Sequence, residues 1–354
     1  MGAFITSSAC ISPQNTINTS VFPSELVQYS TNQLHCIEPN YRDYINPLQL
    51  RRMSKVLKMG LGAAMMCQKQ NNSLNPDAIL VGTALGCSDD LEKFLFSVTN
   101  NKEQSLSPTT FIQSTHNMVA AQIAVVLKNH NYNMTYCHRG FSFEEALIDA
   151  MMLIKEGQAN TILLGGVDEM TPNNYKFFNY LDYWKKEPIS NLQLLNFNNA
   201  GTIAGEGACF FNISAKNDAN NSYINDVSIF YKPQNINEIE EHISLFLKNN
   251  NINKDSLNLV LLGLNGDFNL DANYHQLMQH YFSKNTSFAY YKHLCGEYAT
   301  SSSFALWLAN CILQNKHVPE VIKINKTENN KIDNILIYNH YLNNNHSLML
   351  ISKK

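Results

Sequence analysis

The segment around which the rest of this chain can be placed reads Asn133-Met-Thr-Tyr-Cys-His-Arg-Gly-Phe-Ser-Phe-Glu-Glu-Ala-Leu-Ile-Asp-Ala-Met-Met-Leu-Ile-Lys-Glu-Gly157. Its first residues resemble a short strand, and apolar residues then recur at helical spacing from Phe143 to Ile154. Ser142, followed three residues later by Glu145, predicts a capping box at the helix N-terminus. The segment therefore predicts a strand, a tight turn and a buried helix in direct succession.

Cys137 lies in that turn, just before the predicted helix. Unpaired N–H groups and partial positive charge at a helix N-terminus favour a thiolate and lower the pKa of a thiol, which makes Cys137 a candidate nucleophile. Cysteine is also among the most buried residue types, where it acts as a small hydrophobe. The spacing alone is compatible with both interpretations.

The composition limits the classes of function. The chain has 354 residues, long enough for two structural units, and its net charge of -3 provides no basic field for binding nucleic acid. Its eight cysteines include no Cys-x-x-Cys pair, so we expect reduced thiols and no structural zinc. The N-terminus lacks a signal-peptide pattern, and no run approaches the ~18 apolar residues of a spanning helix. We therefore expect a cytoplasmic protein with no integral membrane segment.

Strand-like and helical patterns alternate along the first half of the chain. We expect strands within residues 3–13, 77–83, 161–169 and 201–213, and helices within residues 51–70 and 110–127. The apolar run 77–83 does not alternate with polar residues, as is typical of a strand covered by helices on both faces. This order predicts an α/β layer architecture.

The second half repeats the plan. We expect a strand at 257–264, a helix at 271–281, a strand at 287–290 and a nearly uncharged, buried helix at 298–314. The polar segment 216–221 separates the halves, so we assign residues 1–215, with Cys137, to one half and residues 216–354 to the other. Glu297 precedes the last buried helix as Cys137 precedes the first.

Several motifs resemble the β-ketoacyl synthase branch of the thiolase-fold superfamily. They are Ile11-Ser-Pro13, Arg51-Arg-Met53, Thr135-Tyr-Cys-His-Arg-Gly140 in place of a Thr-x-Cys-x-x-Gly nucleophile turn, Gly165-Gly-Val-Asp-Glu169 and Gly205-Glu-Gly-Ala208. The resemblance implies an α/β thiolase fold of five αβαβα layers with two pseudo-twofold-related halves. It also implies a dimer formed through the sheet edges.

The closest resemblance is to the short ketosynthase-like proteins of aryl-polyene and flexirubin-type pigment clusters. It lies in Ser114-Thr-His-Asn117 and Phe141-Ser-Phe-Glu144. The family takes its substrates as phosphopantetheine thioesters of acyl carrier protein, and no other cofactor is implied. The aromatic-rich segment 175–184 either lines an acyl pocket or makes ordinary core or dimer contacts.

The motifs depart from the family at its two catalytic histidines. Asn265 falls where the first histidine of a His-Gly-Thr-Gly-Thr turn belongs, and Glu297 replaces the second in a Lys-x-x-x-Gly-His turn that retains Lys292. The glycine-rich loop near the C-terminus appears as Asn339-His-Tyr-Leu-Asn-Asn-Asn345, without its glycines. By this resemblance, Lys292 and Tyr341 are candidate substrate-binding residues.

The replacements alter the expected chemistry. Malonyl decarboxylation needs donors where the thioester enolate develops negative charge, and the paired histidines supply them in the family. Asn265 can still donate a hydrogen bond, whereas an ionised Glu297 opposes the enolate and raises the pKa of Cys137. Alternatively, Glu297 is a general base if burial raises its own pKa. His293 and His340 are displaced from the family positions.

Two hypotheses follow. The first is a non-condensing or poorly condensing, chain-length-factor-like subunit, which pairs with an active ketosynthase in fatty-acid or polyketide-type biosynthesis of aryl polyenes. The second is an active acyltransferase or specialised 3-oxoacyl-carrier-protein synthase that uses Cys137. Both expect acyl carrier protein and a homodimer or a heterodimer with a ketosynthase as partners. Both expect Cys137, Asn265 and Glu297 to meet at one pocket.

Overall fold

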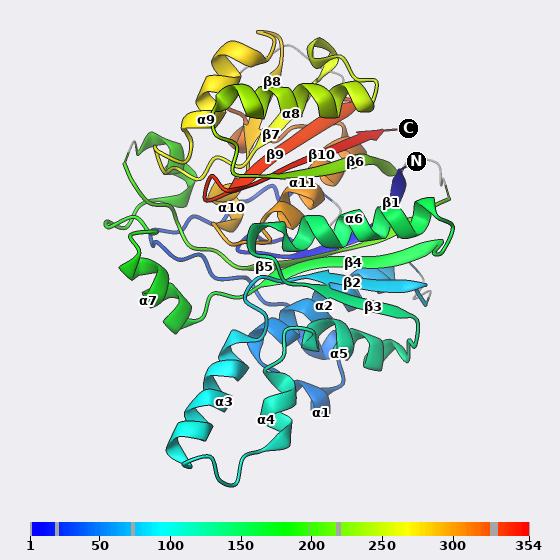
Figure 1. The fold of residues 1–354 in the computed structure, drawn as a ribbon, viewed down its shortest axis with the longest axis vertical. Helices are drawn as coiled ribbons and strands as arrows, with labels where there is room; N and C mark the ends of the chain where they lie inside the picture. The colour runs from blue at the N-terminus through cyan, green and yellow to red at the C-terminus, as the bar shows by residue number, and fades with distance from the viewer. Residues whose placement is uncertain are drawn as a thin grey trace.

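Ten strands form one mixed sheet in the computed structural model, which describes residues 2–17, 21–71, 75–197, 199–216, 221–325 and 332–353 (Figure 1). The strands of the first half are β1 (Ala3–Ile11), β2 (Ala78–Gly82), β3 (Tyr132–Tyr136), β4 (Thr161–Asp168) and β5 (Gly207–Ser214). Those of the second half are β6 (Ser222–Tyr231), β7 (Leu259–Leu262), β8 (Ser287–Tyr290), β9 (Asn334–Tyr341) and β10 (Asn345–Lys353).

The strand order repeats. It runs β3-β2-β4-β5-β1 through the first half and then β6-β10-β9-β7-β8, which is the same order of third, second, fourth, fifth and first read in reverse. The directions match as well: β2 is parallel to β3 and β4, β7 is parallel to β8 and β9, and the remaining pairs are antiparallel. An antiparallel contact between β1 and β6 joins the halves. The prediction of two pseudo-twofold-related halves is thus confirmed.

Helices cover the sheet on both sides and fill the space between its halves. They are α1 (Pro47–Leu50), α2 (Lys55–Gln70), α3 (Ser88–Asn100), α4 (Pro108–Gln113), α5 (Met118–Leu127), α6 (Ser142–Lys155), α7 (Pro172–Tyr180), α8 (Ile236–Asn249), α9 (Ala272–Gln276), α10 (Lys292–Cys295) and α11 (Ser302–Asn315). The shorter turns are η1 (Tyr41–Asp43), η2 (Arg139–Phe141), η3 (Asn191–Asn196), η4 (Lys254–Ser256), η5 (Leu277–Tyr281) and η6 (Glu320–Ile322).

The layers follow from the hydrophobic clusters. One cluster joins α6 and α11 to inward-facing residues of both half-sheets, such as Leu164 and Ile337. A second packs α2 and α5 against the outer face of the first half, and a third packs α8 and α9 against the outer face of the second. Figure 1 shows the resulting αβαβα stack, which confirms the predicted thiolase-type layering. Every residue of α11 from Ser302 to Leu313 is buried, as its uncharged sequence predicts.

Helix α6 begins at the predicted residue by a different mechanism. Its N-cap is Phe141, without a side-chain cap, so the predicted capping box is wrong. The Ser142 hydroxyl instead accepts the His138 backbone N–H, at 2.9 Å. Glu145 bonds the His138 imidazole at 2.6 Å rather than reaching back to the backbone. The turn before the helix is therefore fixed by His138.

The two edges of the sheet differ. At β8, the Asn325 amide oxygen accepts the Phe288 N–H and the Ile324 N–H donates to the Phe288 carbonyl, so residues 324–325 cover that edge. Among the described residues, β3 pairs with β2 alone, and Tyr132 and Met134 on it are exposed. Unpaired edges of this kind invite pairing with another chain.

Two further predictions concern the ends of elements and of halves. The expected helix over 110–127 is two helices, α4 and α5, and α3 precedes them. Residues 217–220 of the predicted boundary segment lie outside the described residues, and the division at 215/216 stays a prediction. No helix among the described residues combines the length and hydrophobicity needed to cross a bilayer.

Candidate functional site

A pocket of about 370 Å³ lies where strands of both halves end. Its polar wall contains Arg139, after β3, Glu297, after β8, and Tyr341, at the end of β9. Carboxyl ends of parallel strands at a crossover point are the usual place for ligand sites in α/β sheets. Glu297 and Tyr341, both predicted site residues, therefore line the same cavity as Arg139, which lies two positions after Cys137.

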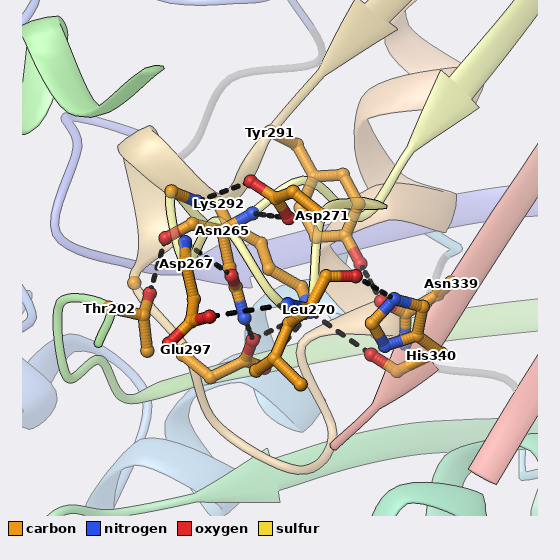
Figure 2. Close-up of polar contacts among 12 residues, drawn as sticks. Thr202, Asn265, Asp267, Leu270, Asp271, Tyr291, Lys292, Glu297, Asn339 and His340 are labelled. Carbon is orange, nitrogen blue, oxygen red and sulfur yellow. Dashed lines mark hydrogen bonds and ion pairs between the residues drawn. The ribbon is translucent and has the colours of Figure 1, made fainter. Parts of the chain in front are cut away.

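Glu297, Lys292 and Asn265 form one hydrogen-bonded group (Figure 2). The Lys292 ammonium lies 3.0 Å from Oε1 and 2.8 Å from Oε2 of Glu297, and Asn265 Nδ2 donates to Oε2 at 2.8 Å. All three residues are buried. A buried carboxylate needs this pairing, because an isolated charge in a protein interior is costly. The structure thus joins Asn265 directly to Glu297, the two residues that the sequence comparison placed at histidine positions of the family.

A crossing of two backbones places Glu297. Gly296 has a φ of +75°, and a Cβ there would lie 2.4 Å from the Gly205 Cα. The Glu297 N–H donates to the Ile203 carbonyl at 2.8 Å, and the Gly205 N–H donates to the Glu297 carbonyl at 3.0 Å. Glycine at both positions permits this approach and the left-handed backbone. The motif glycines Gly205 and Gly296 therefore hold the main chain of residue 297.

A tight turn orients the amide of Asn265. Asp271 accepts the backbone N–H groups of Asn265 and Gly266, and the Asn265 side-chain oxygen accepts the Asp267 N–H at 3.1 Å. Thr202 donates to the Asn265 carbonyl at 2.6 Å. Burial raises the pKa of Asp271 to about 7. With its oxygen already engaged, the amide can present only Nδ2 to Glu297.

His293 and His340, the histidines nearest in sequence to Glu297 and Tyr341, make contacts elsewhere in the core. His340 Nε2 lies 2.9 Å from the Leu270 carbonyl, and its ring stacks on Tyr274. Burial lowers the pKa of His340 well below its usual range and that of His293 to about 3. His293 stacks on Tyr290. Both rings are held neutral in the core, and among the described residues neither ring hydrogen-bonds to Glu297.

Cys137 differs from its sequence-based prediction. It is exposed, between β3 and η2. Partial burial of its sulfur and the nearby Asp168 carboxylate raise the pKa of the thiol to about 11, whereas the sequence predicted a lowered pKa. The physical reason is distance along the chain: α6 starts at Ser142, and the effect of a helix terminus fades within its first turn.

The structure does not bond Cys137 to the other site residues. Among the described residues, no hydrogen bond or ion pair links Cys137 to Asn265 or Glu297, and the pocket wall contains Arg139 in its place. Of the three side chains expected to lie together, only those of Asn265 and Glu297 are in direct contact among the described residues. The catalytic role of Cys137 stays a prediction.

Asp168 connects the two halves at this site, a role that its place in the Gly-Gly-Val-Asp-Glu motif did not reveal. One carboxylate oxygen accepts the N–H groups of Ala84 and Leu85, at 2.8 and 2.9 Å. The other accepts the Thr300 N–H at 3.2 Å and its hydroxyl at 2.9 Å. Burial raises the pKa of Asp168. The Asp168 carboxylate also acts electrostatically on the Cys137 thiol.

The aromatic segment 175–184 supplies the apolar wall of the pocket, through Phe177, Phe178, Leu181, Tyr183 and Trp184. Tyr175 stacks on Trp184 at 5.7 Å between ring centres, and Phe178 packs edge-on against the same indole. Burial and the Glu297 carboxylate raise the pKa of Tyr183 to about 12. Of the two interpretations of this segment, the structure supports the pocket wall. Its ligand is not shown.

Residues 28–204 match the family model described as the β-ketoacyl synthase, N-terminal domain. The chain belongs to the β-ketoacyl synthase family. A comparison with curated protein sequences gives no match. Asn265 and Glu297 lie beyond the matched region.

Solved structures share the fold along the whole chain. The ishigamide ketosynthase/chain length factor is 13% identical, with a TM-score of 0.78 over 100% of this chain and 99% of that one. AntDE:AntF, a type II polyketide synthase acyl carrier protein in complex with its ketosynthase, has 13% identity and a TM-score of 0.78 over 99% and 98%. The ketosynthase ApeO in complex with its chain length factor ApeC, from Xenorhabdus doucetiae, has 13% identity and a TM-score of 0.74 over 100% and 98%. These similarities establish the fold.

Proposed function

We propose that this chain is a non-condensing, chain-length-factor-like subunit that pairs with an active ketosynthase in polyketide-type biosynthesis, of the aryl-polyene kind. One observation carries the proposal: the buried Glu297 carboxylate, at the position that the resemblance assigns to a catalytic histidine, engages both Lys292 and Asn265. Both Lys292 and the Asn265 amide thus donate to a carboxylate of the protein itself.

The chemical reason lies in the transition state of decarboxylation. Loss of carbon dioxide from a malonyl thioester places negative charge on the thioester oxygen, and catalysis requires donors directed at that oxygen. A fixed carboxylate nearby repels the developing charge, and pairing with Lys292 leaves the group without net positive charge. The geometry therefore disfavours condensation.

A second function, acyl transfer through Cys137, is favoured by the exposure of that thiol beside the pocket. Its raised pKa works against this function, because the thiolate is the nucleophile. We rank this function below the first.

The proposed ligand is the acyl chain of a phosphopantetheine thioester carried by acyl carrier protein. The wall formed by Phe178 and Trp184 is suited to an apolar or conjugated chain, because aromatic faces offer large contact areas without polar demands. The complex AntDE:AntF, which contains an acyl carrier protein and a ketosynthase, supports this choice of partner.

The proposed protein partner is a second ketosynthase-fold chain at the β3 edge. That edge is unpaired among the described residues, whereas residues 324–325 cover the opposite edge at β8. Exposed Val125 on α5 lies beside β3 and extends the apolar surface. The pairing of ApeO with its chain length factor supports a heterodimer.

The test is release of carbon dioxide from malonyl acyl carrier protein. We expect none above background with the wild-type protein. The double variant Asn265→His/Glu297→His should gain at least about 10-fold, since a single oxyanion donor is worth about 10²–10³ in rate. Glu297→Gln is the control, because it removes the charge without supplying an imidazole. Wild-type decarboxylation, together with an acyl adduct on Cys137 and a condensation product, would overturn the proposal.

A further inference from the structure

We propose that Lys292 and Asn265 form a carboxylate-binding site and that the Glu297 side chain is its tethered ligand, which keeps the carboxylates of free acyl groups out. This inference rests on the proposed non-condensing function, and it adds a site and the chemical class of its ligand. The site would take small aliphatic carboxylates of the acetate or malonate type once the Glu297 side chain is removed.

The donors match a carboxylate in number and position. Lys292 Nζ contacts both oxygens, at 3.0 and 2.8 Å, and Asn265 Nδ2 adds a second donor to Oε2 at 2.8 Å. Charge-assisted hydrogen bonds of this length are the strong ones. An ammonium that bridges both oxygens, together with one side-chain amide, supplies hydrogen-bond donors to both oxygens of one planar carboxylate.

The donors keep their positions without Glu297. Asn265 is held by hydrogen bonds with Asp267 and Asp271, and neither bond involves the Glu297 side chain. Lys292 is fully buried along its length, and its only other hydrogen-bond acceptor among the described residues is the His340 carbonyl at 3.5 Å. Removal of the carboxylate would therefore leave a buried ammonium with no carboxylate hydrogen-bonded to it, and a replacement anion would be favoured even though Asp271 and Glu144 lie within its electrostatic reach.

The site becomes reachable from the pocket when Glu297 is truncated. Glu297 lines the pocket, whereas Lys292 and Asn265 lie behind it, outside the lining. The backbone of residue 297 is held by Ile203 and Gly205 independently of the side chain. Shortening Glu297 thus opens a path from the 370 Å³ pocket to the two donors without releasing the main chain.

The ligand class follows from the walls. Met170 and Ala299 line the same pocket as apolar side chains, which favours a carboxylate with a short aliphatic tail over an inorganic anion. Sulfate, with a tetrahedral array of oxygens, fits a planar two-oxygen site less well. A malonyl group offers such a carboxylate, and its exclusion by Glu297 would protect an extender unit from futile binding.

The experiment measures the melting temperature of Glu297→Ala in acetate, malonate, sulfate and chloride at matched ionic strength. We expect acetate and malonate to raise the Tm of this variant by about 2–4 °C relative to chloride, as for a ligand well above its Kd. Wild type and Lys292→Met/Glu297→Ala should show no such shift, because the first carries its own ligand and the second lacks the ammonium. If Glu297→Ala requires refolding, it is refolded in acetate and in chloride.

Each result decides the proposal. A carboxylate-specific shift, or folding in acetate alone, supports it. The proposal is overturned if the Tm of Glu297→Ala does not shift, or if it shifts equally in sulfate. It is also overturned if Glu297→Ala folds in neither acetate nor chloride while Lys292→Met/Glu297→Ala folds. Because the readout is binding, failure here leaves the decarboxylation test untouched. A wild-type protein that decarboxylates malonyl carrier protein, is acylated on Cys137 and forms a condensation product would instead remove the proposed function, whatever the melting data show.

Discussion

Cys137 carries a thiol that its surroundings keep protonated. With a pKa of about 11, raised by partial burial and by Asp168, about one thiol in a thousand is ionised at pH 8. We therefore predict that alkylation of Cys137 by iodoacetamide is slow at pH 8 and still accelerates between pH 9 and pH 10. Mass spectrometry of the peptide that contains Cys137, after timed quenching, gives the rate at each pH.

Two variants control this measurement. Cys137→Ser should lose the modified peptide, which assigns the signal among eight cysteines. Asp168→Asn removes the anion that raises the pKa, so its rate profile should move to lower pH. A wild-type rate that levels off below pH 8 would show instead that the helix terminus does activate this thiol.

Single residues show where sequence reasoning succeeded and where it stopped. The motif spacing brought Asn265 and Glu297 together correctly, because both follow strands whose carboxyl ends meet at one edge. The sign of the pKa shift at Cys137 could not be read the same way. It depends first on burial of the sulfur and then on Asp168, which is 31 residues further along the chain, and both arise only in the folded structure. Arg139 belongs to the quoted turn motif, but the sequence did not identify it as a residue of the pocket wall.

Helix α6 is tied to the second half by a buried acid. The Ser347 hydroxyl on β10 donates to Glu144 at 2.8 Å, and burial raises the pKa of Glu144 to about 7 from an ordinary value near 4.5. An acid with a raised folded pKa binds its proton more tightly in the folded protein. Its contribution to stability is therefore full below about pH 4.5 and is lost as pH rises to about 7.

We predict that Glu144→Gln gains stability relative to wild type as pH rises from 5 to 8. The upper limit of the gain is about 3 kcal/mol, because each pKa unit corresponds to about 1.4 kcal/mol. Urea denaturation of both proteins at a series of pH values measures the difference. Glu156→Gln, on an exposed residue that follows the same helix, should give a nearly constant difference. A flat profile for Glu144→Gln would mean that Glu144 is ionised at low cost.

Among the elements, the sequence predicted α6 and α11 well because each combines strong periodicity with a long apolar face. It did not predict the hairpin of β9 and β10. The apolar run Ile335–Tyr338 is a strand signal, but the residues after it contain no glycine to indicate a tight turn. Leu342 and Asn343 nevertheless adopt φ values of 56° and 55°, so the left-handed turn persists without glycine. Pairing along the whole of β10 compensates for that strain.

The whole molecule repeats one strand order on both sides of α6 and α11, and this repeat was visible in the sequence as a succession of strand, turn and buried helix. What the sequence could not give is the difference between the two ends of the sheet. Coverage of β8 depends on two neighbouring residues, the Ile324 backbone and the Asn325 side chain, and no periodic pattern in the sequence predicts it. The unpaired edge at β3 is consequently a property of the assembled fold.

That edge leads to the prediction for assembly. If β3 pairs with its counterpart in another chain, as proposed, the ten-stranded sheet continues across a twofold axis, and an added charge on β3 should oppose association. We predict that wild type forms a dimer, alone or with a co-expressed ketosynthase, and that Met134→Lys shifts the mass measured by light scattering toward that of a single chain. Leu245→Lys, the same change on an exposed residue of α8 far from β3, is the matched control. Circular dichroism should show both variants folded, since Met134 and Leu245 are each about half exposed at 40% and 56%. Pairing at β3 is contradicted if the wild type remains a single chain with and without the ketosynthase. It is also contradicted if the Met134→Lys dimer is as stable as the Leu245→Lys dimer. Either result would leave acyl transfer by an unpaired chain as the stronger function.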